Sequence, residues 1–477
     1  MFRTQTKMYM KKITFLFLWI GLNVFGQNFV DATGNLPQLA FGFSAWGDYD
    51  GDGDLDLYYT GQLNSNNTGG LYQNNQGNFT LVANSGLPLR SLGAAVWGDL
   101  DNDQDLDIII TGYNGTIAVT GVYLNNGNGT FSLHSTNLPG IEYSDVALAD
   151  LNGDGILDLG LTGLNLSANV KMAKIYLGSG NGNFNEVSGL TLPPINNGHL
   201  KFVDYDNDGD VDFVLNGENT ATNSPYTHIW ENDGAANFTE KNFSLPQLKE
   251  GDVEWGDTNN DGKPDLVITG TATGDSEAHL MINNGTSFDE APNFNVMGAQ
   301  NLANIELADF NNDQSLDVYI AGANYANNTA TLIAKIYLNG AASFSENTNV
   351  NLVPLQYVDA HAVDYDADGK VDLFETGVDA NYSGKTKLYH NGAINAVKDN
   401  LLTQFRLYPN PASVNLHIVP LTHLPYQVFI NDLTGKMVFN GQSDAEMEIR
   451  VADYPKGIYL VKIVTAKTSL VQKLIIK

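Results

Sequence analysis

The sequence predicts an all-β protein, a seven-bladed β-propeller followed by a small C-terminal β-sandwich. One acidic phrase recurs seven times, at spacings of 51, 51, 54, 53, 52 and 55 residues, and a fixed period near fifty is typical of propellers and solenoids. Each phrase is followed by segments in which apolar and polar residues alternate, the pattern of half-buried strands. The 477 residues include 48 glycines and no cysteine, which disfavours helical bundles and excludes disulfides and thiolate metal sites.

Each repeat unit contains four short strand-like segments, the content of a propeller blade. An apolar stretch such as Ala45–Trp46 leads into the acidic phrase, and an alternating segment such as Leu106–Ile110 follows it and is expected to end at a Thr-Gly pair. A third segment ends in an aromatic residue and an Asn/Gly turn, as in Tyr123–Gly127, and a fourth begins with phenylalanine, as at Phe131. Because such turns predict hairpins, the propeller is favoured over a parallel β-helix.

The two ends of the repeat region predict how the ring closes. The seventh unit reaches Tyr389–Gly392 but has no fourth strand that begins with phenylalanine. Such a segment occurs instead at the other end of the repeat region, in Asn28–Asp31. We therefore expect residues 28–32 to complete the last blade of a propeller that spans residues 28–397. In the local alternative, Ala393–Val397 forms this strand instead.

Two further segments flank the propeller region. Residues 1–26 place four basic residues before the apolar run Ile13–Phe25, a pattern typical of a cleaved signal peptide. The run is shorter than the about 20 residues of a spanning helix, which disfavours the alternative of a membrane anchor. Residues 398–403 are predicted to be a linker and residues 404–477 a compact β-sandwich, because strand-like segments continue after the repeat stops.

The charge of the chain limits its partners. With 54 acidic and 24 basic residues, the formal net charge is −30. Nucleic acid and anionic lipid repel such a polyanion, so we expect neither as a partner, and no membrane insertion after signal cleavage. Cations are the expected counter-charges.

The acidic phrase places oxygen-bearing side chains at fixed positions, numbered from its first aspartate. Position 1 is always aspartate, at Asp48, Asp99, Asp150, Asp204, Asp257, Asp309 and Asp364. Position 3 is aspartate or asparagine, at Asp50, Asp101, Asn152, Asp206, Asn259, Asn311 and Asp366. Position 5 is always aspartate, at Asp52, Asp103, Asp154, Asp208, Asp261, Asp313 and Asp368. Position 9 is also always aspartate, at Asp56, Asp107, Asp158, Asp212, Asp265, Asp317 and Asp372. Position 7 varies, and is Asp54, Asp105, Ile156, Asp210, Lys263, Ser315 and Lys370.

This pattern predicts a metal-binding loop. Side chains at positions 1, 3, 5 and 9 can converge on one point if the loop curls, while position 7 supplies its backbone carbonyl and is free to vary. The resulting all-oxygen cage suits Ca²⁺ and not zinc or copper, so up to seven Ca²⁺ ions are expected. Glycine at position 6 in five phrases allows the sharp turn. Gln104 and Gln314 stand there in the other two, which are expected to bind more weakly.

Two alternatives to this assignment are weaker. An EF-hand needs a glutamate at position 12 between helices, and only the seventh phrase has one, Glu375, in a strand-like context. Solvated Asp/Asn turns would explain one such loop but not seven with an aspartate always at position 9. Those carboxylates repel one another unless a cation is bound, so we expect the occupied state to be the folded one.

These motifs resemble two known families. The seven phrases resemble the calcium-binding FG-GAP/VCBS repeats, related to the integrin α-subunit propeller, over about residues 28–397. The segment from residue 404 resembles the C-terminal sorting domain of type IX secretion, through Leu407–Ala412, Asp432–Lys436, Pro455–Lys462 and Lys473–Lys477. That resemblance implies recognition by the type IX machinery and export across the outer membrane, to the cell surface or the medium.

The function best supported by the sequence is a non-enzymatic binding or adhesion module for glycan or protein ligands. In related propellers the partner binds the face opposite the calcium loops. The loops expected there carry Tyr113, Tyr143, Tyr226, Tyr325, Tyr357 and Tyr382. Amphipathic aromatics suit glycan or peptide surfaces, although ordinary loop residues are an alternative interpretation for each one.

An enzyme is the second hypothesis, as an extracellular polysaccharide lyase or hydrolase on a propeller scaffold. The eight histidines are scattered, and no nucleophile elbow, phosphate loop or paired metal-ligating histidines occur. We therefore predict no catalytic residues, with His199 and Lys201 as the best remaining candidates. A structural spacer is the third hypothesis.

Overall fold

The computed structural model describes residues 29–327, 329–340, 343–392, 405–408, 411–420, 425–432, 436–452, 454–465 and 469–477. The predicted signal peptide, the linker and the alternative closing segment Ala393–Val397 lie outside these residues. All named elements of the described chain are strands, which confirms the all-β class. No helix among the described residues has the length and apolarity to cross a bilayer.

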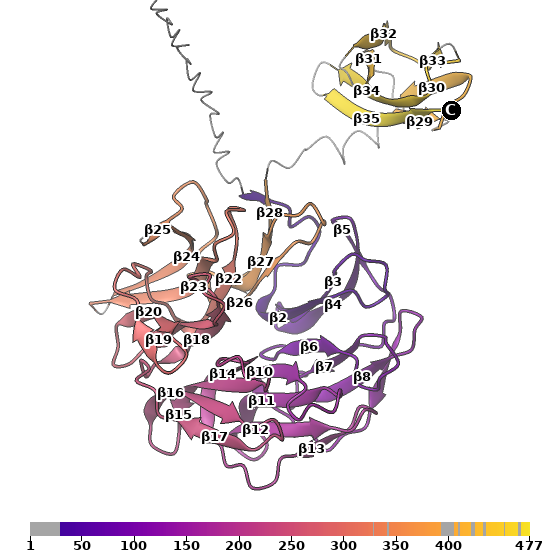
Figure 1. Cartoon of the computed structure of the whole chain (residues 1–477). Coiled ribbons are helices and arrows are strands. Elements are labelled where there is room, and N and C mark those ends of the chain that lie inside the picture. The colour runs from indigo at the N-terminus through magenta and orange to yellow at the C-terminus, as the bar shows by residue number, and fades with distance from the viewer. Residues whose placement is uncertain are drawn as a thin grey trace, which may run out of the picture.

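Seven four-stranded antiparallel sheets form a ring, with one strand of each sheet innermost (Figure 1). The innermost strands are β2 (Ala40–Gly47), β6 (Ala95–Gly98), β10 (Glu142–Ala149), β14 (Ile195–Val203), β18 (Lys249–Gly256), β22 (Gln300–Ala308) and β26 (Gln356–Val363). The second strands are β3 (Asp56–Leu63), β7 (Asp107–Ile110), β11 (Asp158–Asn165), β15 (Asp212–Asn219), β19 (Asp265–Thr271), β23 (Asp317–Ala326) and β27 (Asp372–Val378). The third strands are β4 (Asn66–Asn75), β8 (Gly121–Asn125), β12 (Val170–Gly178), β16 (Ser224–Asn232), β20 (Ser276–Asn283), β24 (Thr329–Asn339) and β28 (Gly384–Asn391). The outer strands are β5 (Asn78–Leu81), β9 (Phe131–His134), β13 (Phe184–Glu186), β17 (Phe238–Lys241), β21 (Phe288–Glu290), β25 (Phe344–Glu346) and β1 (Phe29–Asp31).

The last blade takes its outer strand from the start of the propeller. Strand β1 pairs antiparallel with β28, with Phe29 opposite Asn391 and Asp31 opposite Tyr389. Lys387 donates to Asp31 across this seam, between residues 356 positions apart. The ring is therefore closed by both of its ends, as the phrasing of residues 28–32 indicates.

The second strands are buried on both faces, whereas alternation led us to expect half-buried strands. Every residue of β7 and β19 is buried, because a second strand is covered by the neighbouring blade on each side. The Thr-Gly pair also lies inside β3, β11, β19 and β27 rather than at their ends. Its threonine ties blades together: Thr60 Oγ1 donates to the Arg90 carbonyl at 2.9 Å and Thr162 Oγ1 to the Gly198 carbonyl at 2.7 Å.

The C-terminal segment forms two sheets around one apolar core. The first is β29 (Phe405–Tyr408), β30 (Asn415–Pro420) and β33 (Met447–Arg450), and the second is β32 (Met437–Ser443), β31 (Tyr426–Asp432), β34 (Gly457–Thr465) and β35 (Ser469–Ile476). The core between them contains Phe405, Leu416, Val428, Val461 and Leu474.

Candidate functional site

The seven acidic loops share one hydrogen-bonded conformation at the turn from the innermost to the second strand. In the first loop the Asp52 and Gly53 N–H groups donate to the two carboxylate oxygens of Asp48, each at 3.0 Å, and the Asp54 N–H donates to Asp52 Oδ1 at 3.0 Å. The same three bonds recur in the other six loops. Positions 1 and 5 thereby fix the curl that brings the other carboxylates inward.

The loops place two residues each in the left-handed region, at positions 4 and 6. A sharp turn was predicted only at position 6, where Gln104 and Gln314 have φ of 77° and 70°. Position 4 is asparagine in four loops and Ala367, with φ of 54°, in the seventh. Non-glycine residues in this region cost roughly 1–2 kcal/mol each, so a favourable interaction must hold the loops in this shape.

Position 9 supplies a buried carboxylate in every loop. Asp56 is fully buried, and its two oxygens accept the Asn74 and Tyr49 N–H groups at 2.8 and 3.3 Å. Burial raises the pKa of Asp56 to about 7, and the charges of Asp50 and Asp52 add to this, while those two hydrogen bonds lower it. A carboxylate with a pKa raised in this way gains most from a nearby cation.

Carboxylates from positions 1, 3 and 9 come together in four loops. Ligand atoms of these residues lie within 4.8 Å of one another in the loops that begin at Asp48, Asp99, Asp204 and Asp364. The buried Oδ1 atoms of Asp101, Asp206 and Asp366 accept no hydrogen bond. The other three loops have asparagine at position 3, which also offers an oxygen. In the first six loops the donor set is all oxygen, which fits Ca²⁺.

Glu375, the residue that matched an EF-hand position, is fully buried and points away from its loop. It accepts hydrogen bonds from the hydroxyls of Tyr319 at 2.6 Å and Tyr389 at 3.1 Å. Burial raises its pKa to about 7, although both tyrosine bonds lower it. Glu375 is therefore a residue of the core between blades.

An asparagine at the end of the third strand links neighbouring blades, a role that the sequence reading missed. Asn283 Nδ2 donates at 2.7 Å to the Tyr205 carbonyl, which belongs to position 2 of the preceding loop. Equivalent bonds come from Asn74, Asn125, Asn232, Asn339 and Asn391. The third blade has Gly178 instead, and there the Leu100 carbonyl accepts the Gly182 N–H at 2.9 Å. The recurring Asn of the Asn/Gly turn was the available signal, but it was assigned only to the hairpin.

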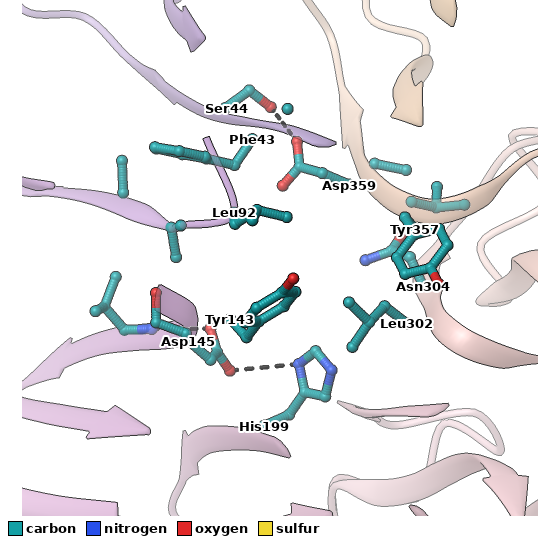
Figure 2. Close-up of a pocket in the computed structure, with 18 of the residues that line it drawn as sticks. Phe43, Ser44, Leu92, Tyr143, Asp145, His199, Leu302, Asn304, Tyr357 and Asp359 are labelled. Atoms are coloured by element: carbon teal, nitrogen blue, oxygen red, sulfur yellow. Dashed lines mark hydrogen bonds and ion pairs between the residues drawn. The ribbon is translucent and has the colours of Figure 1, made fainter. Parts of the chain in front are cut away.

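On the opposite face, a cavity of about 270 Å³ lies among the beginnings of the innermost strands (Figure 2). Figure 2 shows Tyr143 projecting into it, toward Leu302 and Tyr357 on the opposite wall. Phe41 packs edge-on against Tyr357, with ring centroids 5.5 Å apart. An aromatic and apolar rim therefore surrounds the entrance.

This rim is built on a strained bulge that repeats in every blade. Seven residues stand seven positions before the first loop aspartate, all with φ between 45° and 62°: Phe41, Leu92, Tyr143, Asn197, Glu250, Leu302 and Tyr357. The register of six innermost strands shifts at this point. Bulges re-aim side chains, and left-handed non-glycine residues cluster at functional sites. All but Glu250 line the cavity.

Below the rim, charged residues of the innermost strands line the cavity. His199 lies between two carboxylates, 3.5 Å from Asp145 and 3.3 Å from Asp252, and Lys201 lies 3.2 Å from Glu254. Burial raises the pKa of Glu306 to about 7; the charge of His361 lowers it, and that of Glu254 raises it further. His199 and Lys201, the best catalytic candidates from the sequence, thus lie on the innermost strand β14 and belong to this lining.

The polar lining retains hydrogen-bonding capacity. The side chains of His199, His361 and Asn304 each have a buried polar atom without a hydrogen-bond partner. Ser44 donates to Asp359 at 2.6 Å from the opposite side of the cavity. The pocket therefore presents both apolar platforms and unfilled polar positions.

The six predicted surface tyrosines do not form one group. Tyr143 and Tyr357 line the cavity, whereas Tyr226 is buried, stacks on His228 and donates to Glu240 at 2.7 Å. Tyr325 lies close to Asn301, and Tyr382 is 61% exposed. Burial raises the pKa of Tyr357, and nearby Tyr382, Tyr143 and Tyr325 raise it further, so Tyr325 and Tyr382 lie close to the rim.

Comparison with known structures returns distant matches. A mutant Tc holotoxin pore from Photorhabdus luminescens is 15% identical, with 92% of this chain and 20% of that chain covered and a TM-score of 0.35. The extracellular domain of the one-component system BT4673 from B. thetaiotaomicron is 10% identical, with 95% and 58% covered and a TM-score of 0.38. Sucrose-6-phosphate hydrolase from Lactobacillus gasseri is 9% identical, with 70% and 86% covered and a TM-score of 0.32. The chain thus spans about a fifth and somewhat over half of the first two proteins, and no curated protein matches it in sequence.

Family models identify both parts of the chain. The secretion system C-terminal sorting domain matches residues 406–477, which indicates export by the type IX system to the cell surface or the medium. The FG-GAP-like repeat matches residues 48–110, 99–161, 204–268, 257–320 and 309–375, and these segments together span more than half of the chain. The chain therefore belongs to the FG-GAP-like repeat family and carries a type IX sorting domain at its C-terminal end.

Proposed function

We propose that this exported propeller is a calcium-stabilised, non-enzymatic binding module that recognises a glycan or protein ligand at the cavity opposite its acidic loops. Calcium is supported by the shared loop conformation and by the convergent carboxylates of positions 1, 3 and 9. The ions would hold the ends of the innermost and second strands, and so keep the ring rigid. The acidic loops are thus assigned to stability, and the opposite face to recognition.

The single observation that carries the binding proposal is the cavity with its strained aromatic rim. Its volume of about 270 Å³ is near the lower end of the roughly 300–1,000 Å³ of small-molecule sites, so it suits one sugar ring or one side chain of a larger ligand. Tyr143 and Tyr357 offer ring faces, and Asn304, His199 and Asp359 offer hydrogen bonds beside them. Sugars present an apolar ring face and several hydroxyls, so this combination suits a glycan end.

A glycan array tests the proposal, with the Tyr143→Ala variant beside the wild type. We expect the variant to lose at least tenfold in affinity for any glycan that the wild type binds. The Tyr408→Ala variant is the matched control, since Tyr408 is exposed and lies in β29 of the C-terminal domain, outside the cavity. Equal binding by wild type and Tyr143→Ala would contradict the assignment of the pocket.

Catalysis is a second candidate because Glu306 lines the cavity with a pKa raised to about 7 by burial. Carboxylic acids tuned toward neutral pH serve as general acids. New reducing ends or unsaturated products from polysaccharides, absent with Glu306→Gln, would support this reading. Binding without turnover in the same preparations would favour the binding module.

A further inference from the structure

The seventh acidic loop differs from the other six in the side chain that faces it from the third strand. The residue before the interblade asparagine, or before Gly178 in its place, is Gln73, Leu124, Leu177, Glu231, Ile282, Leu338 and His390 in chain order. This position points at the loop, because Gln73 Nε2 donates to Asp50 Oδ2 at 2.7 Å in the first blade. In the seventh blade it brings an imidazole nitrogen to the corresponding aspartate.

His390 on β28 is held inside this loop. Its side chain is 9% exposed, and Nδ1 lies 3.4 Å from Asp366 Oδ2 and 3.3 Å from Asp372 Oδ1. The Tyr365 ring packs edge-on against the imidazole, with centroids 6.3 Å apart. The imidazole is therefore confined between position 3, position 9 and an aromatic wall.

Three atoms of this cluster are buried without a hydrogen bond. They are His390 Nδ1, Asp366 Oδ1 and Asp372 Oδ2. In the other six loops the Oδ2 atom of position 9 accepts the N–H group of position 2, but Asp372 Oδ2 accepts none. Buried polar atoms without a hydrogen bond cost about 1–3 kcal/mol each, so a ligand that binds Asp366 Oδ1 and Asp372 Oδ2 would stabilise the cluster.

The donor set does not fit calcium as well as in the other loops. Ca²⁺ takes oxygen ligands, whereas imidazole suits zinc, nickel and copper. Lys370 Nζ lies 3.2 Å from Asp368 Oδ2 and so engages position 5, which leaves His390, Asp366, Asp372 and Asp364 as four donors. Ligands about 2.1 Å from a tetrahedral Zn²⁺ lie about 3.4 Å apart, close to the two distances measured from Nδ1.

We infer that the seventh loop is a mixed nitrogen–oxygen site for a transition-metal ion of the zinc class, held by His390, Asp366, Asp372 and Asp364. Ligand atoms of Asp364, Asp366 and Asp372 lie within 4.8 Å of one another, as do those of Asp366, Asp368 and His390. This inference goes beyond the proposed function. The metal would sit at the seam of the ring, because β28 also pairs with β1.

Metal analysis of the full chain tests the inference. Chelator-treated protein is dialysed against Zn²⁺ in excess Ca²⁺, and its bound metals are counted. We expect one Zn²⁺ per wild-type chain and at least a 100-fold weaker affinity in His390→Gln, which copies the residue of the first blade. The His417→Gln variant, altered in the C-terminal domain, should retain the zinc.

A spectroscopic readout separates coordination from a structural effect of the substitution. Cu²⁺ placed in the site of the wild type should show nitrogen hyperfine coupling, which His390→Gln removes. Equal calcium-dependent melting of both proteins would show that the variant folds. The inference would be overturned if His390→Gln left zinc binding unchanged. It would also be overturned if the wild type bound no zinc and the variant bound one more calcium ion, because His390 would then act as an internal counter-ion. These outcomes are independent of glycan binding.

Discussion

Replacement of Asn283 by alanine tests whether the interblade asparagines stabilise the ring. Asn283 is 1% exposed, its Nδ2 donates to the Tyr205 carbonyl at 2.7 Å and to the Pro264 carbonyl at 3.1 Å, and its Oδ1 accepts the Gly285 N–H at 2.8 Å. Each hydrogen bond contributes about 1 kcal/mol net, so the loss should reach about 3 kcal/mol. The third blade, which lacks the asparagine, keeps an equivalent interblade hydrogen bond, because the Gly182 N–H donates to the Leu100 carbonyl.

Thermal melting in saturating calcium measures this loss. At about 2.1 cal/mol/K per residue, unfolding of residues 29–392 has an entropy near 0.75 kcal/mol/K, so about 3 kcal/mol lowers Tm by about 4 °C. Asn66→Ala is the control, because Asn66 is exposed and its side chain bonds only the nearby Asn64 carbonyl. A Tm for Asn283→Ala within 1 °C of this control would refute the role assigned to the asparagines.

Three further predictions concern the metal loops and the core. Chelation should lower Tm by about 4 °C for each calcium ion removed, and Ca²⁺ should restore it, because each site filled at 100 times its Kd adds about 2.7 kcal/mol; an unchanged melt would contradict calcium binding. Gln104→Gly should stabilise the calcium-saturated protein by about 1 kcal/mol and tighten calcium binding by calorimetry, since it relieves a φ of 77°. Burial raises the pKa of Glu375 to about 7 in the fold, from an ordinary value of 4.5, so its proton stabilises the fold. Stability should therefore fall by about 3 kcal/mol as pH rises from 4.5 to 7, and melts of Glu375→Gln should lack this component.

The repeat period and the turn chemistry were enough to predict the blades. Four strands per unit follow from local patterns, and the missing fourth strand of the last unit identifies Phe29–Asp31 as its substitute. The burial of the second strands could not be predicted from alternation, because both of their faces pack on other blades. The prediction that the Thr-Gly pair ends its strand was wrong, because its threonine lies inside the strand and its hydroxyl donates a hydrogen bond to a carbonyl between or on neighbouring blades.

The acidic loops were predictable as a pattern, but the pocket was not. Positions 1 to 9 lie close together in sequence, so spacing alone indicates their convergence. The cavity rim instead collects one residue from each of six blades, and Tyr143 looks no different in sequence from the buried Tyr226. The left-handed residue of the bulge is never glycine, although a glycine follows it in four blades, at Gly42, Gly93, Gly198 and Gly251. His390 was likewise only one scattered histidine until β28 placed it beside Asp366.

Because β1 pairs with β28, the ring of blades cannot close until the last strand of the repeat region has been synthesised. A nascent chain holds Phe29–Asp31 without a partner until Asn391 has emerged. Every shortened chain therefore leaves a bare strand edge, a template for aggregation. The sorting domain, residues 406–477, is synthesised after β28, so a chain that has completed its sorting domain also contains the strand that closes the ring.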